Sequence, residues 1–226
     1  MKHAFLVTGT DTGVGKTLIS AALVHLGAQL GYAAAGLKPV AAGCREEGGR
    51  LLSEDVELLQ AASSVQLASA IVNPYAFAPP LAPHIAAEQA GCRIELSSIV
   101  AAVRQAQAET DFLVVEGVGG FRVPLGPDFD TADLAQMLGL PLVLVVGLRL
   151  GCLNHALLTA EAIAARGLTL AGWVANRVDP HMAAPQENLH ALREHLLAPC
   201  LGEVPYQAQP DFRVAAAALD GGMLLR

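Results

Sequence analysis

Short apolar runs alternate along the chain with longer segments in which apolar residues recur every three or four positions. The short runs predict buried strands at residues 4–7, 33–37, 112–115, 142–146 and 170–175. The longer segments predict helices at residues 18–30, 53–62, 96–107, 132–138, 153–166 and 187–197. Such alternation predicts an α/β fold, with a mostly parallel central sheet flanked by helices on both faces.

No internal repeat interrupts this order, and no linker is long enough to separate two domains. We therefore expect residues 1–226 to form a single α/β domain. Residues 73–83 are rich in proline and predict an ordered loop.

The sequence Gly-Thr-Asp-Thr-Gly-Val-Gly-Lys-Thr at residues 9–17 lies between the first strand and the first helix. A phosphate-binding loop (P-loop) occurs in this context: a strand is followed by a glycine-rich turn, by Gly-Lys-Thr and by a helix. In such a loop, backbone N–H groups surround the phosphates. We expect Lys16 to reach the outer phosphates and the Thr17 hydroxyl to hold Mg²⁺. The strict spacing requires glycine where Thr10 stands, and Gly9 lies one residue earlier, so the loop is a variant of the motif. We expect the fold to be P-loop NTPase-like.

Several polar residues follow predicted strands, where ligands bind in parallel sheets. Lys38 suits stabilisation of an anionic transition state, although a solvated loop lysine is the alternative. Glu116 follows an apolar strand, as a Mg²⁺ carboxylate does in P-loop enzymes; the alternative is a turn-forming acid. The amide of Asn176 suits an adenine edge, or it forms an ordinary turn.

Two further residues occupy predicted helix starts. Asp55 is either a second carboxylate beside the metal or a complement to the helix dipole, and the sequence slightly favours the dipole. Asn154, after Gly151, is either an N-cap or part of an anion-binding helix terminus.

Composition limits the partners of the chain. It is 53% hydrophobic and 15% charged, with a net charge of −7, so we expect neither nucleic acid nor a membrane surface as a partner. The apolar run at residues 138–148 is much shorter than the ~20 residues of a membrane helix. Four widely spaced cysteines and too few apolar residues at the N-terminus for a signal peptide predict reduced thiols in a cytoplasmic protein.

The motifs together resemble the dethiobiotin synthetase family. They are the phosphate loop at residues 8–17, Gly-Leu-Lys-Pro-Val at 36–40, Val-Asn-Pro-Tyr at 72–75, Ala-Pro-His at 82–84, Val-Glu-Gly-Val-Gly-Gly at 115–120, Leu-Gly-Cys-Leu-Asn-His at 150–155 and Gly-Trp-Val-Ala-Asn at 172–176. The resemblance covers residues 4–205 and is weaker in the tail after Tyr206.

This resemblance implies an ATP- and Mg²⁺-dependent ligase acting on 7,8-diaminononanoate (7,8-diaminopelargonate) and CO₂ or bicarbonate. CO₂ adds to one amine, the carbamate attacks the γ-phosphate of ATP, and the second amine displaces phosphate from the carbamic–phosphoric anhydride. The products are dethiobiotin, ADP and phosphate, in the penultimate step of biotin biosynthesis. Members of the family are homodimers whose substrate bridges the subunit interface.

Matching positions imply the following roles. Catalytic residues are Lys38 and Lys16, and metal-side residues are Thr17, Asp55 and Glu116. The ATP contacts are Gly13, Val14, Gly15, Lys16, Thr17, Leu18, Asp55, Glu116, Gly117, Val118 and Gly119, with Asn176, Arg177, Pro205, Tyr206 and Gln207 on the adenine side. Substrate contacts are Thr12, Lys38, Ala42, Gly151, Cys152, Leu153 and Asn154, of which the last four receive the carboxylate from the neighbouring subunit.

Three positions depart from the enterobacterial family pattern. Ala42 and Ala82 stand where that pattern has serines, and Gly13 replaces a glutamate in the loop. The change at Ala42 removes a possible hydrogen bond to the substrate, although backbone contact there remains available.

Two other classes share parts of this pattern. A partitioning-type regulatory P-loop ATPase carries a signature lysine where this chain has Asp11, and it needs a basic surface or an amphipathic tail. An amidoligase of cobalamin synthesis usually carries an additional glutamine-hydrolysing domain, for which this chain has no room.

Overall fold

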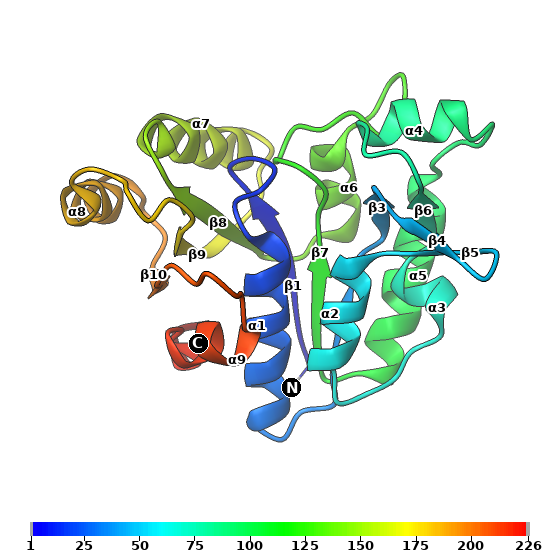
Figure 1. The fold of residues 1–226 in the computed structure, drawn as a ribbon, viewed down its shortest axis with the longest axis horizontal. Helices are drawn as coiled ribbons and strands as arrows, with labels where there is room; N and C mark the ends of the chain where they lie inside the picture. The colour runs from blue at the N-terminus through cyan, green and yellow to red at the C-terminus, as the bar shows by residue number, and fades with distance from the viewer. Residues whose placement is uncertain (1, 225–226) are drawn as a thin grey trace.

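A sheet of six parallel strands forms the centre of the computed structural model, which describes residues 2–224. Its strand order is β10-β9-β8-β1-β7-β2, and Figure 1 shows β1 between β8 and β7. The strands are β1 (His3–Gly9), β2 (Ala34–Leu37), β7 (Phe112–Glu116), β8 (Leu142–Leu148), β9 (Leu170–Arg177) and β10 (Cys200–Val204). Chain order reverses beside β1, so the loop after β1 lies at a topological switch point, where α/β sheets bind ligands.

Helices cover both faces of the sheet, as predicted. Along β1, Phe5 and Val7 pack against α1 (Lys16–Gln29) and α2 (Glu54–Ala62), and α9 (Phe212–Ala217) joins the same cluster. Leu6 faces the other way, because successive side chains of a strand alternate between faces. The second face is covered by α5 (Leu96–Glu109), α6 (Thr131–Leu138), α7 (Cys152–Ala165) and α8 (Pro185–His195).

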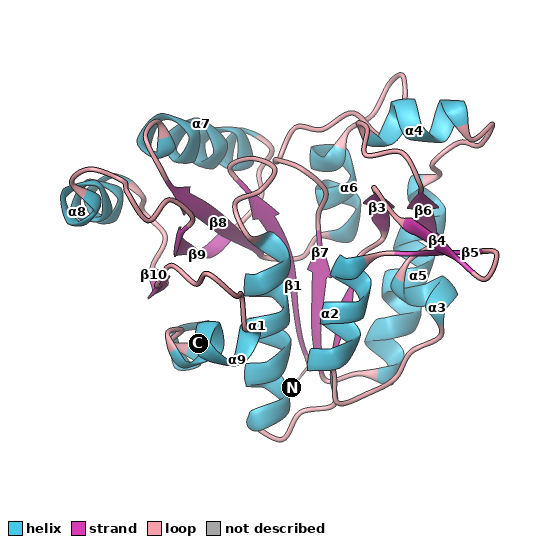
Figure 2. Cartoon of the chain, viewed as in Figure 1, coloured by secondary structure: helices cyan, strands magenta, loops and turns pink. Residues whose placement is uncertain are grey.

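The prediction of a loop at residues 73–83 was wrong, since it contains a strand and the first residue of a helix. The strand β6 (Tyr75–Phe77) pairs in parallel with β3 (Val40–Ala42), and the helix is α4 (Pro83–Gln89). The Tyr75 N–H donates to the carbonyl of Pro39, so the pairing depends on a distant segment. The remaining elements are α10 (Gly221–Leu224) and, labelled in Figure 2, the hairpin of β4 (Arg45–Glu47) and β5 (Arg50–Leu52) and helix α3 (Ser69–Val72).

The predicted helix boundaries shift by one or two residues in the structure, and α1 and α8 show why. Helix α1 begins at Lys16, two residues before the predicted start, because Gly15 with φ of +86° ends the loop there. Helix α8 begins at Pro185, whose missing N–H costs nothing in the first turn, and it ends at His195. Within residues 2–224, the helices are all too short or too polar to cross a bilayer.

Candidate active site

The phosphate loop connects β1 to α1 and is shaped by residues that tolerate no larger side chain. A Cβ at Gly9 would come within 2.7 Å of the Val14 side chain, which explains glycine at this position despite the variant spacing. Gly13 and Gly15 have φ of +74° and +86°, a region that glycine enters at little cost. Thr10, where the strict motif has glycine, donates its backbone N–H to the carbonyl of Val145 at 3.0 Å.

Asn176 supports this loop from the end of β9. Its Nδ2 donates to the carbonyl oxygen of Val14 at 2.9 Å, and its side chain is buried. A Cβ added at Gly15 would lie 2.2 Å from that same nitrogen. One amide donor of Asn176 is therefore occupied by the loop, and its contact with an adenine edge stays a prediction.

A buried cluster of opposite charges lies beside the loop. The Lys38 ammonium lies 2.5 Å from Glu116 Oε1 and 2.9 Å from Asp55 Oδ2, and it donates to the Gly117 carbonyl at 3.2 Å. The Thr17 hydroxyl donates to Glu116 Oε1 at 2.8 Å. Lys38 is only 4% exposed, which rules out the solvated loop lysine.

The charges of this cluster stabilise one another. Burial alone lowers the pKa of Lys38, but the carboxylates of Glu116 and Asp55 outweigh it and raise that pKa above its usual value. Burial likewise raises the pKa of Asp55, but the charge of Lys38 and its hydrogen bond to the carboxylate prevail, and the net shift is downward. At neutral pH Lys38 is therefore an ammonium and Asp55 a carboxylate. Asp55 lies in the first turn of α2, as the dipole reading predicts, and its place beside the metal stays a prediction.

Lys16 is a different kind of cation. Burial and the nearby charge of Lys38 lower its pKa to about 8. Its Nζ donates to the backbone carbonyl of Asp11 at 2.8 Å. Among residues 2–224, Lys16 therefore has a neutral carbonyl as its partner and no carboxylate. We expect it to exchange that carbonyl for a phosphate oxygen.

These groups face one cavity of about 880 Å³, which we call the reaction cavity. It brings together about half of the residues assigned from the sequence: Thr12, Gly13, Gly15, Lys16, Thr17, Lys38, Ala42, Asp55, Glu116, Val118 and Gly119. Its wall also includes residues 80–83 and Arg122, which the sequence reasoning did not assign. The Ala-Pro-His motif at residues 82–84 was a usable signal for the first segment, and nothing in the sequence pointed to Arg122.

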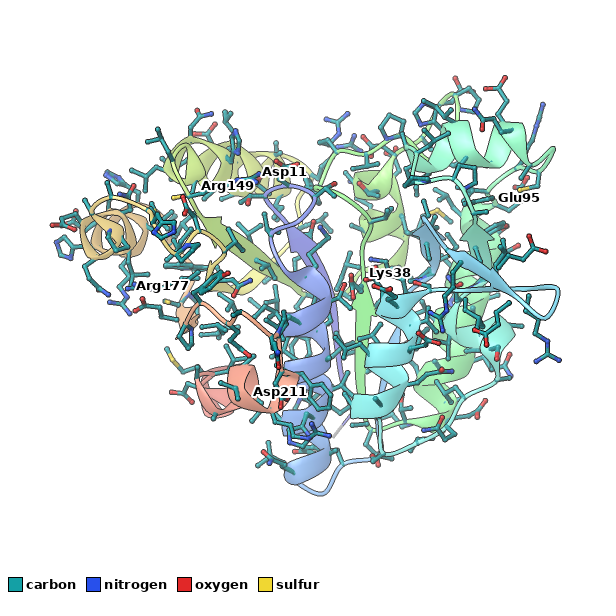
Figure 3. All side chains as sticks on the ribbon, viewed as in Figure 1. Asp11, Lys38, Glu95, Arg149, Arg177 and Asp211 are labelled. Atoms are coloured by element: carbon teal, nitrogen blue, oxygen red, sulfur yellow. The ribbon has the colours of Figure 1, made fainter. Side chains whose placement is uncertain are left out.

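A second cavity of about 530 Å³, which we call the outer cavity, lies at the ends of β9 and β10. It is lined by three predicted adenine-side residues, Arg177, Pro205 and Tyr206. Glu203, which was not assigned, accepts from Arg177 Nε at 2.7 Å. Figure 3 shows Arg177 and Lys38 on opposite sides of α1, so the two cavities lie on either side of the phosphate loop and its helix.

The other assigned residues line neither cavity. Four of them, Gly151, Cys152, Leu153 and Asn154, form the start of α7, where Gly151 has φ of +94°. Arg149, just before this turn, lies 2.5 Å from Asp11 of the phosphate loop, and Figure 3 shows the two residues together. The others are Val14, Leu18, Gly117, Asn176 and Gln207.

Comparisons with known proteins identify relatives of this chain. A family model described as an AAA domain matches residues 3–212. ATP-dependent dethiobiotin synthetase BioD of Ralstonia nicotianae is 56% identical over 219 residues, which cover 97% of this chain and 96% of that protein. The enzyme of the same name from Aromatoleum aromaticum is 54% identical, with 96% of each chain covered.

Solved structures with much lower sequence identity resemble this chain in fold alone. A ParA family ATPase from Chlorobium tepidum superposes with a TM-score of 0.57 at 14% identity, covering 99% of this chain and 96% of that one. The MinD cell division protein of Aquifex aeolicus has a TM-score of 0.55 at 13% identity, covering 98% and 93%. Both support the predicted P-loop NTPase-like architecture.

Proposed function

The chain belongs to the family of ATP-dependent dethiobiotin synthetases, and from this premise we propose how its two cavities carry out that reaction. It is a ligase that joins 7,8-diaminononanoate and CO₂ at the expense of ATP, giving dethiobiotin, ADP and phosphate. This is the penultimate step of biotin biosynthesis. The observation that carries the proposal is the Lys38 ammonium, buried between two carboxylates in a cavity that the phosphate loop also lines.

Two anions must meet in this reaction, and the chain supplies cations to bring them together. The lone pair of one substrate amine forms a bond to the carbon of CO₂, and the amine loses a proton, which gives a carbamate. A carbamate oxygen then attacks the γ-phosphorus and ADP leaves. The second amine attacks the carbamoyl carbon and phosphate leaves, closing the cyclic urea. Lys16 and Lys38 stabilise the negative charge that accumulates when carbamate and γ-phosphate approach.

The oxygen groups beside the loop fit Mg²⁺. Thr17 offers a hydroxyl, while Glu116 and Asp55 offer carboxylates, and Mg²⁺ prefers such hard oxygen ligands together with substrate phosphates. Glu116 Oε2 is buried and has no hydrogen-bond partner among the described residues, as expected of an oxygen reserved for a ligand. The ion, when bound, neutralises charge on the β- and γ-phosphates.

We assign the nucleotide base to the outer cavity. Asn176, Arg177, Pro205, Tyr206 and Gln207 come from the adjacent ends of β9 and β10, on the far side of the phosphate loop from Lys38. Pro205 and Tyr206 offer apolar surface to a flat base, and the buried Nε2 of Gln207 has no partner within residues 2–224. This amide is a free donor for a ring nitrogen.

The site is proposed to need two chains. The start of α7 presents backbone N–H groups without intrahelical partners, which suits the substrate carboxylate. It lies outside the reaction cavity of its own chain, and Leu150 beside it is 96% exposed. In a homodimer this segment would complete the cavity of the neighbouring chain.

Mixing Lys38→Ala chains with Asn154→Ala chains tests this arrangement. If the two subunits of a dimer share their sites, a mixed dimer has one intact site and activity returns. Confirmed exchange of subunits without activity would contradict the arrangement.

A regulatory ATPase is not favoured as an alternative. The ParA and MinD structures share only 13–14% sequence identity with this chain and support the fold alone. The synthetases share more than 50% sequence identity with it over nearly the full length. Asp11 stands where a signature lysine would be needed, and it is bonded to Arg149.

Mass spectrometry of the product tests the proposed function. The purified protein is incubated with diaminononanoate, ¹³C-bicarbonate, ATP and Mg²⁺. We expect dethiobiotin with one ¹³C in its urea group, formed in step with ADP. Nucleotide hydrolysis without a new urea, or hydrolysis stimulated by DNA or lipid, would reject the proposal.

A further inference from the structure

A small apolar cavity lies behind the reaction cavity, at the carboxyl ends of β1 and β7. Its volume is about 20 Å³. The two cavities share a wall, because Glu116, Val118 and Gly120 line both. Most of its other walls are apolar, from the side chains of Leu6, Val40, Val115, Phe121, Leu125 and Leu134.

The size of this cavity suits a very small molecule. A buried water needs roughly 10–15 Å³ of such space, so about 20 Å³ admits a linear triatomic molecule and excludes an amino acid or a nucleotide. Its wall residues are well packed core residues: Val40 and Val115 are 3% and 1% exposed. The cavity is therefore not opened by a loosely placed side chain.

Water is a poor occupant of this space. A buried water typically makes about three hydrogen bonds to protein groups. The Thr131 hydroxyl on the wall is already used, since it donates to the carbonyl of Phe121 at 2.6 Å and accepts from the N–H of Val123 at 2.9 Å. Glu116 Oε1 accepts from Lys38 and Thr17, and Glu116 Oε2 is the oxygen assigned above to Mg²⁺, which leaves Thr8 as the remaining polar side chain on the wall.

We propose that this cavity binds CO₂, an inference that rests on the proposed function. CO₂ is small, linear and without a dipole moment, so it gains from leaving water for an apolar space. The position also fits the chemistry, because Lys38 donates to the carbonyl of Gly117, a residue on the cavity wall. CO₂ is held next to the place where the carbamate must form.

Filling the cavity tests this role in turnover. Val40→Ile and Val115→Ile each add one methyl group to its wall, and Val103→Ile is the matched control, since Val103 belongs to the same apolar core but does not line the cavity. We expect KM for CO₂ to rise about five- to tenfold in both filled variants. The KM for ATP and the kcat at saturating CO₂ should stay unchanged in these variants. The control variant Val103→Ile should keep the wild-type KM for CO₂. An unchanged KM for CO₂ in folded filled variants overturns the proposal.

Crystals of the wild-type protein pressurised with CO₂ test it without any variant or turnover. Linear density for CO₂ against Val40 and Leu125 is expected, and water or an empty cavity under saturating CO₂ overturns the proposal. This readout separates the two hypotheses. A protein that forms no dethiobiotin refutes the proposed function, whereas one that forms it without CO₂ in this cavity refutes only the further inference.

Discussion

The reaction cavity and the outer cavity each contain an ion pair, but the two pairs differ in their contact with water. The side chains of Lys38 and Glu116 are 5% and 0% exposed, whereas those of Arg177 and Glu203 are 30% and 25% exposed. Burial removes the screening that water provides, so the charges of the first pair act strongly on each other and on any ligand. The second pair is solvated at its edge and contributes much less.

From this difference we expect the reaction cavity to carry out the chemistry and the outer cavity to recognise the nucleotide. A buried charge left without its partner costs about 3–5 kcal/mol, so the reaction cavity tolerates little change. An exposed ion pair is typically worth about 0.2–1 kcal/mol, so we expect the outer cavity to adjust nucleotide affinity with little effect on the reaction. Four predictions test this contrast, from the largest expected effect to the smallest.

Removing divalent metal is expected to have the largest effect. Turnover should fall to background in excess chelator and return when Mg²⁺ is added back, because the oxygens of Thr17 and Glu116 act on ATP through the ion. Adenosine carries no phosphate and is expected to occupy only the outer cavity, so calorimetry should find its binding unaffected by the chelator. Full turnover in the presence of chelator would exclude the metal site.

Replacing the buried cation follows. Lys38→Ala should reduce kcat by about two to three orders of magnitude, since one preorganised charge aimed at the developing anion is lost. The melting temperature should fall as well, because Glu116 stays buried without its ammonium. Arg177→Ala is the matched control, as it removes a cation from the outer cavity. A folded Lys38→Ala enzyme with near wild-type kcat would remove this lysine from the mechanism.

The lowered pKa of Lys16 predicts a dependence of nucleotide affinity on pH. With a pKa of about 8 in the free protein, the ammonium is mostly present at pH 7 and mostly lost at pH 9. Affinity for ATP should therefore weaken about tenfold over this range, and binding near pH 8 should take up a proton. Calorimetry in buffers of different ionisation enthalpy measures that uptake. Lys16→Arg does not titrate in this range and should bind with a flat profile; identical profiles would contradict the assignment.

Breaking the outer ion pair is expected to have the smallest effect. Glu203→Gln keeps the shape of the side chain but removes the charge that faces Arg177. The KM for ATP should change by up to about fivefold, with kcat unchanged, as an exposed pair allows. A large loss of kcat would show that the outer cavity is part of the chemistry, and the contrast drawn here would fail.

The same contrast explains which parts of the molecule the sequence could predict. The phosphate loop, Lys38 and Glu116 were recognisable because their chemistry requires particular residues at the ends of buried strands. The five predicted strands of the sheet are present, since each is a continuous apolar run. Burial of Lys38 and its bonds to two carboxylates, however, depend on segments far apart in the chain.

Elements that depend on tertiary pairing were missed. Strand β10 contains Gly202 and Glu203 within five residues, so its apolar pattern is weak, and its pairing with β9 is shifted at Gly202. Strands β3 and β6 have three residues each and are held by each other. Arg122 reaches the reaction cavity from a loop and forms an ion pair with Asp130, an arrangement that no local pattern indicates.

The central claim is that carbamate and γ-phosphate react with each other in the reaction cavity, and transfer of oxygen-18 tests it most directly. The enzyme is mixed with diaminononanoate, ATP, Mg²⁺ and CO₂ labelled in both oxygens, and it is quenched before the label exchanges with water. If a carbamate oxygen attacks the γ-phosphorus, each phosphate released carries one oxygen-18 and each urea retains the other. Phosphate free of the label, formed together with dethiobiotin, would contradict the account.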